Sequence, residues 1–264
     1  MHALRGLHRP RARAPREVQL IRGPGKSGPG GDAASRVAAL AERYALPDDA
    51  VPRLLAFHRL LVEDPLAPTA VRDPLKAIDD HLADSLVGLE VESIRSAVCL
   101  ADLGSGAGVP GLALAIALAG TRVSLVESAS RRSAFLERAV AASQTTNAVV
   151  VNARVETWPE GLAAFDVVTA RALAPLPVVV EYAAPLLIVG GTLAVWRGKR
   201  NPGDEDAGAR AAAHLGLELT EIRHMQPFPA AENRYLHLMS KVTETPLGFP
   251  RRPGMALKRP LGAC

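Results

Sequence analysis

The chain has 264 residues, of which 48% are hydrophobic but only 4% aromatic, so its core must consist mainly of Ala, Val and Leu. No apolar run reaches the roughly 18 residues that a membrane-spanning helix needs. The two cysteines, Cys99 and Cys264, are too few for a disulfide framework. These features argue against membrane-embedded and disulfide-rich secreted classes, and we expect a monomer in the cytoplasm with no membrane partner.

The net charge of +4 is concentrated at the two ends of the chain. Seven Lys or Arg and one Glu lie in residues 1–30, and five basic residues and one Glu lie in residues 241–264, so the body between them is acidic. Frequent Pro and Gly predict a disordered basic extension over residues 1–31, with an organelle transit peptide as the less favoured alternative. Four prolines predict an extended basic tail over residues 243–264. Such ends attract polyanions, although solvated tails without a partner are the alternative.

Between these ends the periodicity of the sequence changes once. Residues 32–92 predict a small helical lobe, with helices over 32–45, from about residue 48, and over 73–89, where Asp73 caps the helix and Pro74 takes the first helical position. Residues 93–242 alternate strands and helices, which predicts an α/β fold with a doubly wound, mostly parallel sheet. The expected strands are 97–103, 121–127, 148–151, 165–170, 191–196, 217–226 and 234–241, and the expected helices are 109–119, 129–143, 175–187 and 204–215. The last two strands are joined by a short connection, which predicts an antiparallel edge.

The segment 102–111, Asp-Leu-Gly-Ser-Gly-Ala-Gly-Val-Pro-Gly, follows a buried strand and precedes a helix. Glycine adopts backbone angles closed to other residues and lets a ligand approach the main chain. The start of the following helix offers free N–H groups to an anionic or carboxylate-bearing ligand. The segment therefore predicts a site for a nucleoside-type cofactor. A glycine turn that only packs a helix on a sheet is the structural alternative.

The glycine spacing indicates which cofactor this is. Gly104, Gly106 and Gly108 form G-x-G-x-G, whereas the dinucleotide fingerprint G-x-G-x-x-G would place Gly at Val109. Asp102, just before the turn, would repel a pyrophosphate but attract an ammonium group. This pattern resembles motif I of class I methyltransferases, which bind S-adenosylmethionine. NAD binding, and with it an oxidoreductase, is the alternative.

Several segments outside the glycine turn carry a more specific pattern. They are residues 70–74, 81–85, 131–136, 153–156, 169–176 (Thr-Ala-Arg-Ala-Leu-Ala-Pro-Leu), 250–254 (Pro-Arg-Arg-Pro-Gly) and 258–261. Together they resemble the bacterial 16S ribosomal RNA guanine-N7 methyltransferases known as the glucose-inhibited division protein B family. The resemblance implies a class I methyltransferase fold, S-adenosylmethionine as methyl donor, and N7 of a guanine in 16S rRNA or the small ribosomal subunit as acceptor. One departure is Arg197-Gly198, where the family usually has Lys-Gly.

The resemblance and the strand ends together suggest individual site residues. The expected cofactor-binding residues are Gly104, Gly106, Gly108, Val109, Glu127, Val155, Glu156 and Arg171, with Glu127 accepting bonds from the ribose hydroxyls and Val155 and Glu156 close to the adenine. The expected RNA-binding residues are Arg171, Arg197, Arg251, Arg252, Lys258 and Arg259, because cations contact phosphates. No catalytic base is assigned, because N7 carries a lone pair and no proton. No metal site is expected, since Cys pairs and His-x-x-x-His are missing.

Each of these assignments has a structural alternative. Glu127 and Glu156 could be surface carboxylates, and Arg171 could form a purely structural ion pair. His81 and Asp84 lie three residues apart on one helix face, where they could order a cover over the cofactor or pack the lobe on the main domain. Two other functions also remain open: a class I methyltransferase acting on a small molecule or protein, and a non-catalytic RNA-binding assembly factor on the same fold.

Overall fold

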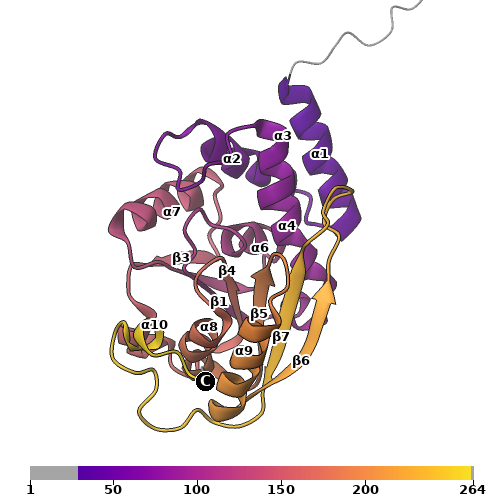
Figure 1. Cartoon of the computed structure of the whole chain (residues 1–264). Coiled ribbons are helices and arrows are strands. Elements are labelled where there is room, and N and C mark those ends of the chain that lie inside the picture. The colour runs from indigo at the N-terminus through magenta and orange to yellow at the C-terminus, as the bar shows by residue number, and fades with distance from the viewer. Residues whose placement is uncertain (1–28, 263–264) are drawn as a thin grey trace, which may run out of the picture.

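The computed structural model describes residues 29–262, with side chains from Ala33 onward, so the predicted extension over residues 1–31 lies almost entirely outside the described residues. The helical lobe comes first (Figure 1). It contains α1 (Pro29–Tyr44), α2 (Ala50–Glu63), a continuous helical stretch made of α3 (Pro74–Ala77), η1 (Ile78–Ala83), α4 (Asp84–Leu86) and η2 (Val87–Glu90), and finally α5 (Glu92–Arg95). α1 begins at Pro29 rather than at the predicted residue 32.

The third predicted helix exists, but its middle is wider than an α-helix. Asp73 caps it as predicted, because its side chain accepts a hydrogen bond from the Lys76 N–H at 2.7 Å. Residues Ile78–Ala83 form a π-helix, an uncommon geometry that is frequent at functional sites. The spacing of apolar residues in the sequence does not distinguish a π-helix from an α-helix here. His81 lies in this π-helix and Asp84 directly follows it. Both residues are buried, with exposed fractions of 6% and 3%.

Seven strands form one sheet in the order β3-β2-β1-β4-β5-β7-β6 (Figure 1). The strands are β1 (Cys99–Leu103), β2 (Arg122–Val126), β3 (Ala148–Val151), β4 (Phe165–Arg171), β5 (Leu187–Arg197), β6 (Leu217–His224) and β7 (Tyr235–Lys241). β1 to β5 pair in parallel, and β7 runs antiparallel to both of its neighbours. The predicted doubly wound, mostly parallel sheet with an antiparallel edge is therefore confirmed. β5 begins at Leu187, before the predicted residue 191, because Gly190 (φ +90°) lies inside the strand rather than in a turn.

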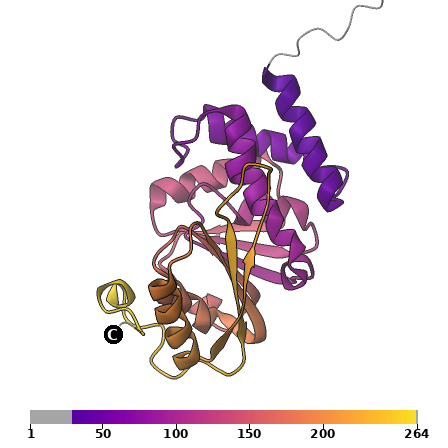
Figure 2. The same ribbon diagram turned by 45° about the vertical axis from the view of Figure 1, so that its right-hand side comes forward.

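Helices cover both faces of the sheet (Figure 2). On one face α6 (Gly111–Ala117), α7 (Ser130–Ala142) and the helical lobe share a core, and on the other α8 (Leu176–Ala183) and α9 (Pro202–His214) share a second core. Leu100 belongs to the first core and Ala101 to the second, because alternate residues of a strand face opposite sides. Burial on both faces explains why the central strands are nearly continuous apolar runs.

The C-terminal segment folds back onto the domain instead of remaining extended. It contains one helical turn, α10 (Met255–Lys258), which lies beside α8 (Figure 1). Ala256 is only 2% exposed and belongs to the same core as α8. The few apolar residues between the prolines, too sparse to produce a periodic pattern, anchor the segment. Within residues 29–262, no helix has the length and apolar character to cross a membrane.

Candidate functional site

The glycine turn lies at the carboxyl end of β1, as predicted. Gly104, Gly106 and Gly108 have φ angles of +65°, +53° and +86°, which lie in the left-handed region that favours glycine. The turn is fixed to the neighbouring strand, because the N–H groups of Gly104 and Ser105 both donate to the Val126 carbonyl, at 2.9 and 3.1 Å. These bonds hold the main chain as a fixed cradle at the edge where open α/β sheets bind ligands.

Asp102 is buried beneath this turn. Its carboxylate accepts hydrogen bonds from Thr169 Oγ1 at 2.8 Å, from the Gly111 N–H at 3.1 Å and from Ser105 Oγ. Burial raises the pKa of Asp102 to about 6, although these three donors favour the charged form. The carboxylate therefore ties the turn to β4 and to the start of α6. The side chain is fully buried and bonded within the protein, whereas the sequence analysis expected it to attract an ammonium group.

Glu127 follows β2 and is 4% exposed. Its Oε2 accepts a hydrogen bond from the Gly106 N–H at 3.2 Å, and its Oε1 accepts one from the Ala129 N–H at 2.9 Å. Arg132 Nη1 lies 3.9 Å from Oε2. Glu127 thus joins the glycine turn to the start of α7. Each carboxylate oxygen has a second lone pair, so further hydroxyl donors can be accepted.

A cavity of about 150 Å³ opens beside the cradle. Its lining residues are Gly104, Val126, Ser128, Ala153, Arg154, Val155, Glu156, Leu173, Ala174, Tyr182 and Leu257. The predicted cofactor residues Gly104, Val155 and Glu156 meet here. Gly106 and Glu127 lie in the adjoining turn, whereas Gly108 and Val109 pack toward the core of the lobe.

Tyr182 and Leu257 are among the lining residues that the sequence analysis did not assign to the cofactor. Tyr182 lies on α8, and burial together with its hydrogen bond to Glu156 raises its pKa to about 12. Glu156 Oε1 also accepts a hydrogen bond from the Gly254 N–H at 3.0 Å. Tyr182 lies within an apolar helix and gave no separate signal, and Leu257 lies in the segment expected to be extended.

A second cavity, of about 270 Å³, opens at the ends of β4 and β5. Its lining residues are Asp84, Val87, Arg171, Ala172, Trp196, Arg197, Gly198, Lys199, Met225, Arg234, Tyr235 and Leu236. The turn over residues 171–174 contributes to both cavities, since Arg171 and Ala172 line this one while Leu173 and Ala174 line the first. Ala172 has a φ of +51°, a strained conformation for a residue with a side chain.

A network of ion pairs around the buried Asp84 forms one wall of the second cavity. Asp84 lies 2.8 Å from Arg171 Nη1 and 3.0 Å from Arg234 Nε, and its backbone carbonyl accepts a hydrogen bond from Trp196 Nε1 at 2.7 Å. Burial raises the pKa of Asp84, and the two arginines oppose this rise. Arg171 therefore forms the ion pair proposed as its structural alternative while it also lines the cavity. Arg234 was missed, because its partner lies far away in the sequence.

His81 lies on the same helical stretch as Asp84, one turn before it. Its Nε2 is 2.8 Å from Thr69 Oγ1, whereas its buried Nδ1 has no hydrogen-bond partner among the described residues. Burial, reinforced by the charge of Arg171, lowers the pKa of His81 to about 4. The imidazole is therefore neutral near pH 7. Across residues 29–262, no group of three or more His, Cys, Asp or Glu could hold a metal ion.

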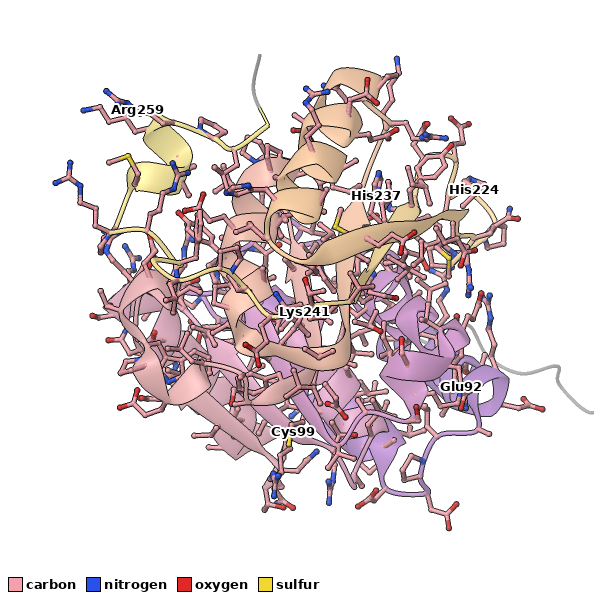
Figure 3. The ribbon with its side chains drawn as sticks, turned by 90° about the horizontal axis from the view of Figure 1, so that it is seen from below. Glu92, Cys99, His224, His237, Lys241 and Arg259 are labelled. Carbon is pink, nitrogen blue, oxygen red and sulfur yellow. The ribbon has the colours of Figure 1, made fainter. Side chains whose placement is uncertain are left out.

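The cations predicted to bind RNA fall into two groups. Arg197 pairs with Asp204 and donates to the Ala174 carbonyl, and Arg251 pairs with Glu181, so both side chains contact protein groups. The other three predicted tail cations, Arg252, Lys258 and Arg259, are exposed. Arg259 projects from α10 away from the body of the molecule (Figure 3).

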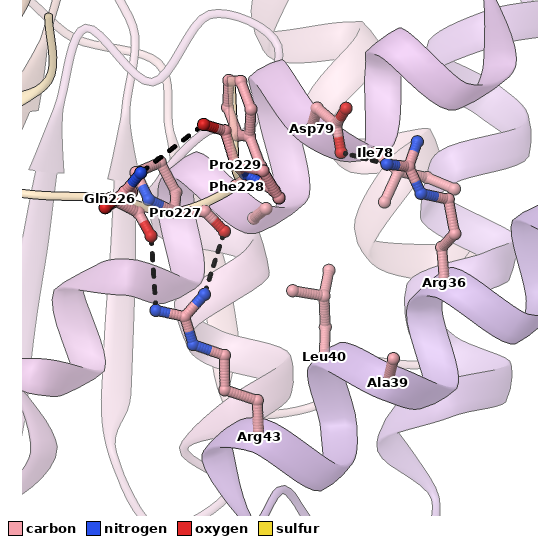
Figure 4. Close-up of a pocket in the computed structure, with 11 residues that line it drawn as sticks. Arg36, Ala39, Leu40, Arg43, Ile78, Asp79, Gln226, Pro227, Phe228 and Pro229 are labelled. Carbon is pink, nitrogen blue, oxygen red and sulfur yellow. Dashed lines mark hydrogen bonds and ion pairs between the residues drawn. The ribbon is translucent and has the colours of Figure 1, made fainter. Parts of the chain in front are cut away.

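A larger hollow lies elsewhere, between α1 and the loop that joins β6 to β7 (Figure 4). Its volume is about 590 Å³. Arg43 donates to the carbonyls of Pro227 and Gln226 at 3.0 and 3.3 Å, and Arg36 pairs with Asp79 at 3.2 Å. The bonds of Arg43 join the lobe to the loop, whereas the pair of Arg36 and Asp79 lies within the lobe.

The sequence model of the family described as rRNA small subunit methyltransferase G matches residues 64–230. The chain belongs to this family. Proteins named ribosomal RNA small subunit methyltransferase G from Chloroflexus aggregans and Rubrobacter xylanophilus are 41% and 38% identical to it. These alignments cover 73% and 72% of this chain and 82% and 75% of the relatives. A solved O-methyltransferase from Thermotoga maritima is 15% identical, with a TM-score of 0.48 and 72% of each chain covered.

Membership of the rRNA small subunit methyltransferase G family confirms the resemblance seen in the sequence. The matched span contains the glycine turn, Glu127, Glu156 and Arg171. It ends before Arg234, which completes the ion-pair network, and before the C-terminal segment, which closes the first cavity.

Proposed function

We propose that this protein transfers the methyl group of S-adenosylmethionine to N7 of a guanine in 16S rRNA. One observation carries the proposal: in a member of this family, two different cavities open at the carboxyl edge of the sheet, on either side of the turn over residues 171–174. One is narrow and partly apolar beside a glycine cradle, and the other is lined by cations. Such a pair of cavities suits a donor nucleoside and an RNA base.

The residues around the smaller cavity fit S-adenosylmethionine. The glycine cradle lets a ligand approach the main chain at Gly104, and Val155, Tyr182 and Leu257 offer apolar contact to an adenine ring. Glu127 has lone pairs for the ribose hydroxyls. When bound, this cosubstrate supplies an electrophilic methyl group on a positively charged sulfur. The same residues position it against the turn that leads to the second cavity.

The residues of the larger cavity fit a base extruded from folded RNA. Asp84 fixes the guanidinium groups of Arg171 and Arg234, so their remaining N–H donors are held in place for the base or its phosphate. Trp196 and Tyr235 add aromatic surface. A base in folded RNA must be splayed out to enter such a cavity, which suits a preformed wall.

The chemistry of N7 explains why the site contains no obvious general base. N7 offers an in-plane lone pair and loses no proton, so no side chain has to accept one. His81, which is neutral and bonded to Thr69, is not needed for proton transfer. The protein instead contributes by aligning donor and acceptor and by holding its charges in fixed positions. A ribosomal substrate would place the enzyme in the cytoplasm, with 16S rRNA or the small subunit as its partner.

Methylation of defined substrates tests this proposal. The protein is incubated with methyl-labelled S-adenosylmethionine and with small subunits, or naked 16S rRNA, from a strain that lacks the gene. We expect 7-methylguanosine in nucleoside digests, with a rate that falls steeply as salt rises. A different methylated nucleoside would refute the assignment to N7. RNA binding without cofactor binding would favour an assembly factor instead.

A further inference from the structure

The C-terminal segment contacts the smaller cavity through residues that the sequence analysis assigned to RNA or left without a role. Leu257 of α10 lines that cavity together with Val155 and Tyr182. Leu257 is nevertheless 59% exposed, whereas Ala256 and Tyr182 are buried. A large apolar side chain at the mouth of a cavity would be covered if a flat ring occupied that cavity.

Three sets of bonds hold the segment in this position. Arg251 Nε donates to Glu181 Oε1 at 2.7 Å, and Arg251 Nη2 donates to the Arg259 carbonyl at 2.8 Å. The Gly254 N–H donates to Glu156 Oε1 at 3.0 Å. At the far end, Arg210 donates to the Gly262 carbonyl at 2.9 and 2.7 Å. The segment is therefore fixed on both sides of α10.

The burial of Glu181 explains why the position of the C-terminal segment depends on Arg251. The Glu181 residue is 1% exposed, and a buried carboxylate without a partner is strongly unfavourable. Arg251 supplies that partner and is at most partly exposed itself, whereas its chain neighbour Arg252 is exposed. Adjacent arginines thus face opposite environments, one toward the protein and one toward solvent.

We propose that residues 249–262 form the outer wall of the S-adenosylmethionine site, with Leu257 contacting the adenosyl group and Arg251 acting as a positioning residue through Glu181. The proposal rests on the proposed function, because it takes the smaller cavity as the cofactor site. It reassigns Arg251 from RNA binding to cofactor binding. Arg252, Lys258 and Arg259 keep the predicted contacts with RNA phosphates on the outer side of the same wall.

A further consequence is that the two ligands are coupled. Phosphates bound by the outer cations would hold α10 against the domain, and a bound cofactor would cover the exposed face of Leu257 from inside. Such coupling is reciprocal for binding free energies, so RNA should tighten cofactor binding by the same factor by which cofactor tightens RNA binding.

Two matched pairs of single variants of the full chain test the wall, with Arg251→Lys as a fifth variant. Leu257→Ser removes the apolar contact at an exposed position. Leu247→Ser is its matched control, because Leu247 lies just before the wall, is fully exposed (101%) and does not line the cavity. Arg251→Ala and Arg252→Ala form the second matched pair. Calorimetric titration with S-adenosylmethionine, and with the unreactive S-adenosylhomocysteine, gives the affinity, and steady-state kinetics on small subunits separate KM from kcat.

We expect Leu257→Ser to weaken cofactor binding about five-fold, as loss of a partly buried leucine contact implies. Arg251→Ala should weaken it about ten-fold or more, with KM for the cofactor rising in step and kcat at saturating cofactor unchanged within about two-fold. Arg251→Lys should recover part of the affinity, since it restores a cation near Glu181. Arg252→Ala should leave cofactor affinity unchanged and reduce the salt dependence of RNA binding by about one unit of slope.

The outcomes separate this proposal from the proposed function. If wild-type protein binds the cofactor and Leu257→Ser binds it as tightly as Leu247→Ser, the wall is refuted and the proposed function stands. If Arg251→Ala lowers RNA affinity as Arg252→Ala does while cofactor affinity is unchanged, the reassignment of Arg251 is wrong. If wild-type protein binds no cofactor, the proposed function and the wall are both rejected.

Discussion

Gly111, the first residue of α6, provides a quantitative test of how the glycine turn is built. A Cβ atom on Gly111 would lie 2.5 Å from Asp102 Cβ, 2.6 Å from Asp102 Oδ2 and 2.6 Å from Leu125 Cδ2. All of these neighbours are buried, so they cannot move into solvent. Overpacking of this kind costs about 1–3 kcal/mol, and the hydrogen bond from the Gly111 N–H to Asp102 would be weakened as well.

We therefore expect Gly111→Ala to destabilise the protein by about 3 kcal/mol and to lower its Tm by about 6–12 °C. Calorimetric or circular-dichroism melting measures this. Gly120→Ala is the matched control, because a Cβ there meets nothing within 4 Å, and its Tm should equal that of the wild type. Gly106→Ala should fall between them, since its φ of +53° costs about 1–2 kcal/mol while the nearest atom is 3.6 Å away. A Tm for Gly111→Ala within about 2 °C of that for Gly120→Ala would refute the close packing of α6 on Asp102.

Three further predictions concern the two cavities. Glu127→Gln removes the charged acceptor expected for the ribose hydroxyls, so S-adenosylmethionine should bind about 10- to 100-fold more weakly. Calorimetric titration measures this affinity, and an unchanged Kd would contradict the role of Glu127. The pKa of His81 is lowered to about 4, so as the pH falls below about 6.5 this histidine is protonated in the unfolded chain before it is protonated in the folded one. The free energy of unfolding should therefore drop by about 2 kcal/mol between pH 7 and 5, relative to that of His81→Gln. Denaturant titration at both pH values measures this difference. Equal pH dependence in both proteins would refute that assignment. Trp196→Phe leaves the Asp84 carbonyl without its 2.7 Å hydrogen bond and should cost about 1–3 kcal/mol in the same assay, whereas a loss below about 0.5 kcal/mol would mean that water replaces the indole.

The sheet and the glycine cradle could be predicted because their signals are local. The central strands are buried on both faces and therefore appear as apolar runs, and the positive φ angles at Gly104, Gly106 and Gly108 require the residue type seen there. Glu127 could be located because the ends of parallel strands meet at one edge.

The rest of the site depends on contacts between distant residues. Arg234 forms an ion pair with Asp84 although the two residues lie far apart in the sequence. The sequence around either residue gives no indication of this pair. The hydrogen bonds of the Asp102 side chain had no signal in the sequence, because its partners Thr169 and Gly111 come together only in the folded sheet. Arg251 resembles Arg252 in sequence, and only the burial of Glu181 distinguishes the two.

The position of β7 has a consequence for how the protein is made. β7 is the last strand in the sequence, yet it lies between β5 and β6. During translation, which proceeds from the N-terminus, β6 has no strand to pair with until β7 has left the ribosome. Arg234, immediately before β7, arrives equally late and closes the wall around Asp84. A nascent chain that stops short of β7 can contain the glycine cradle, but it lacks the Arg234 side of the cavity proposed for the base.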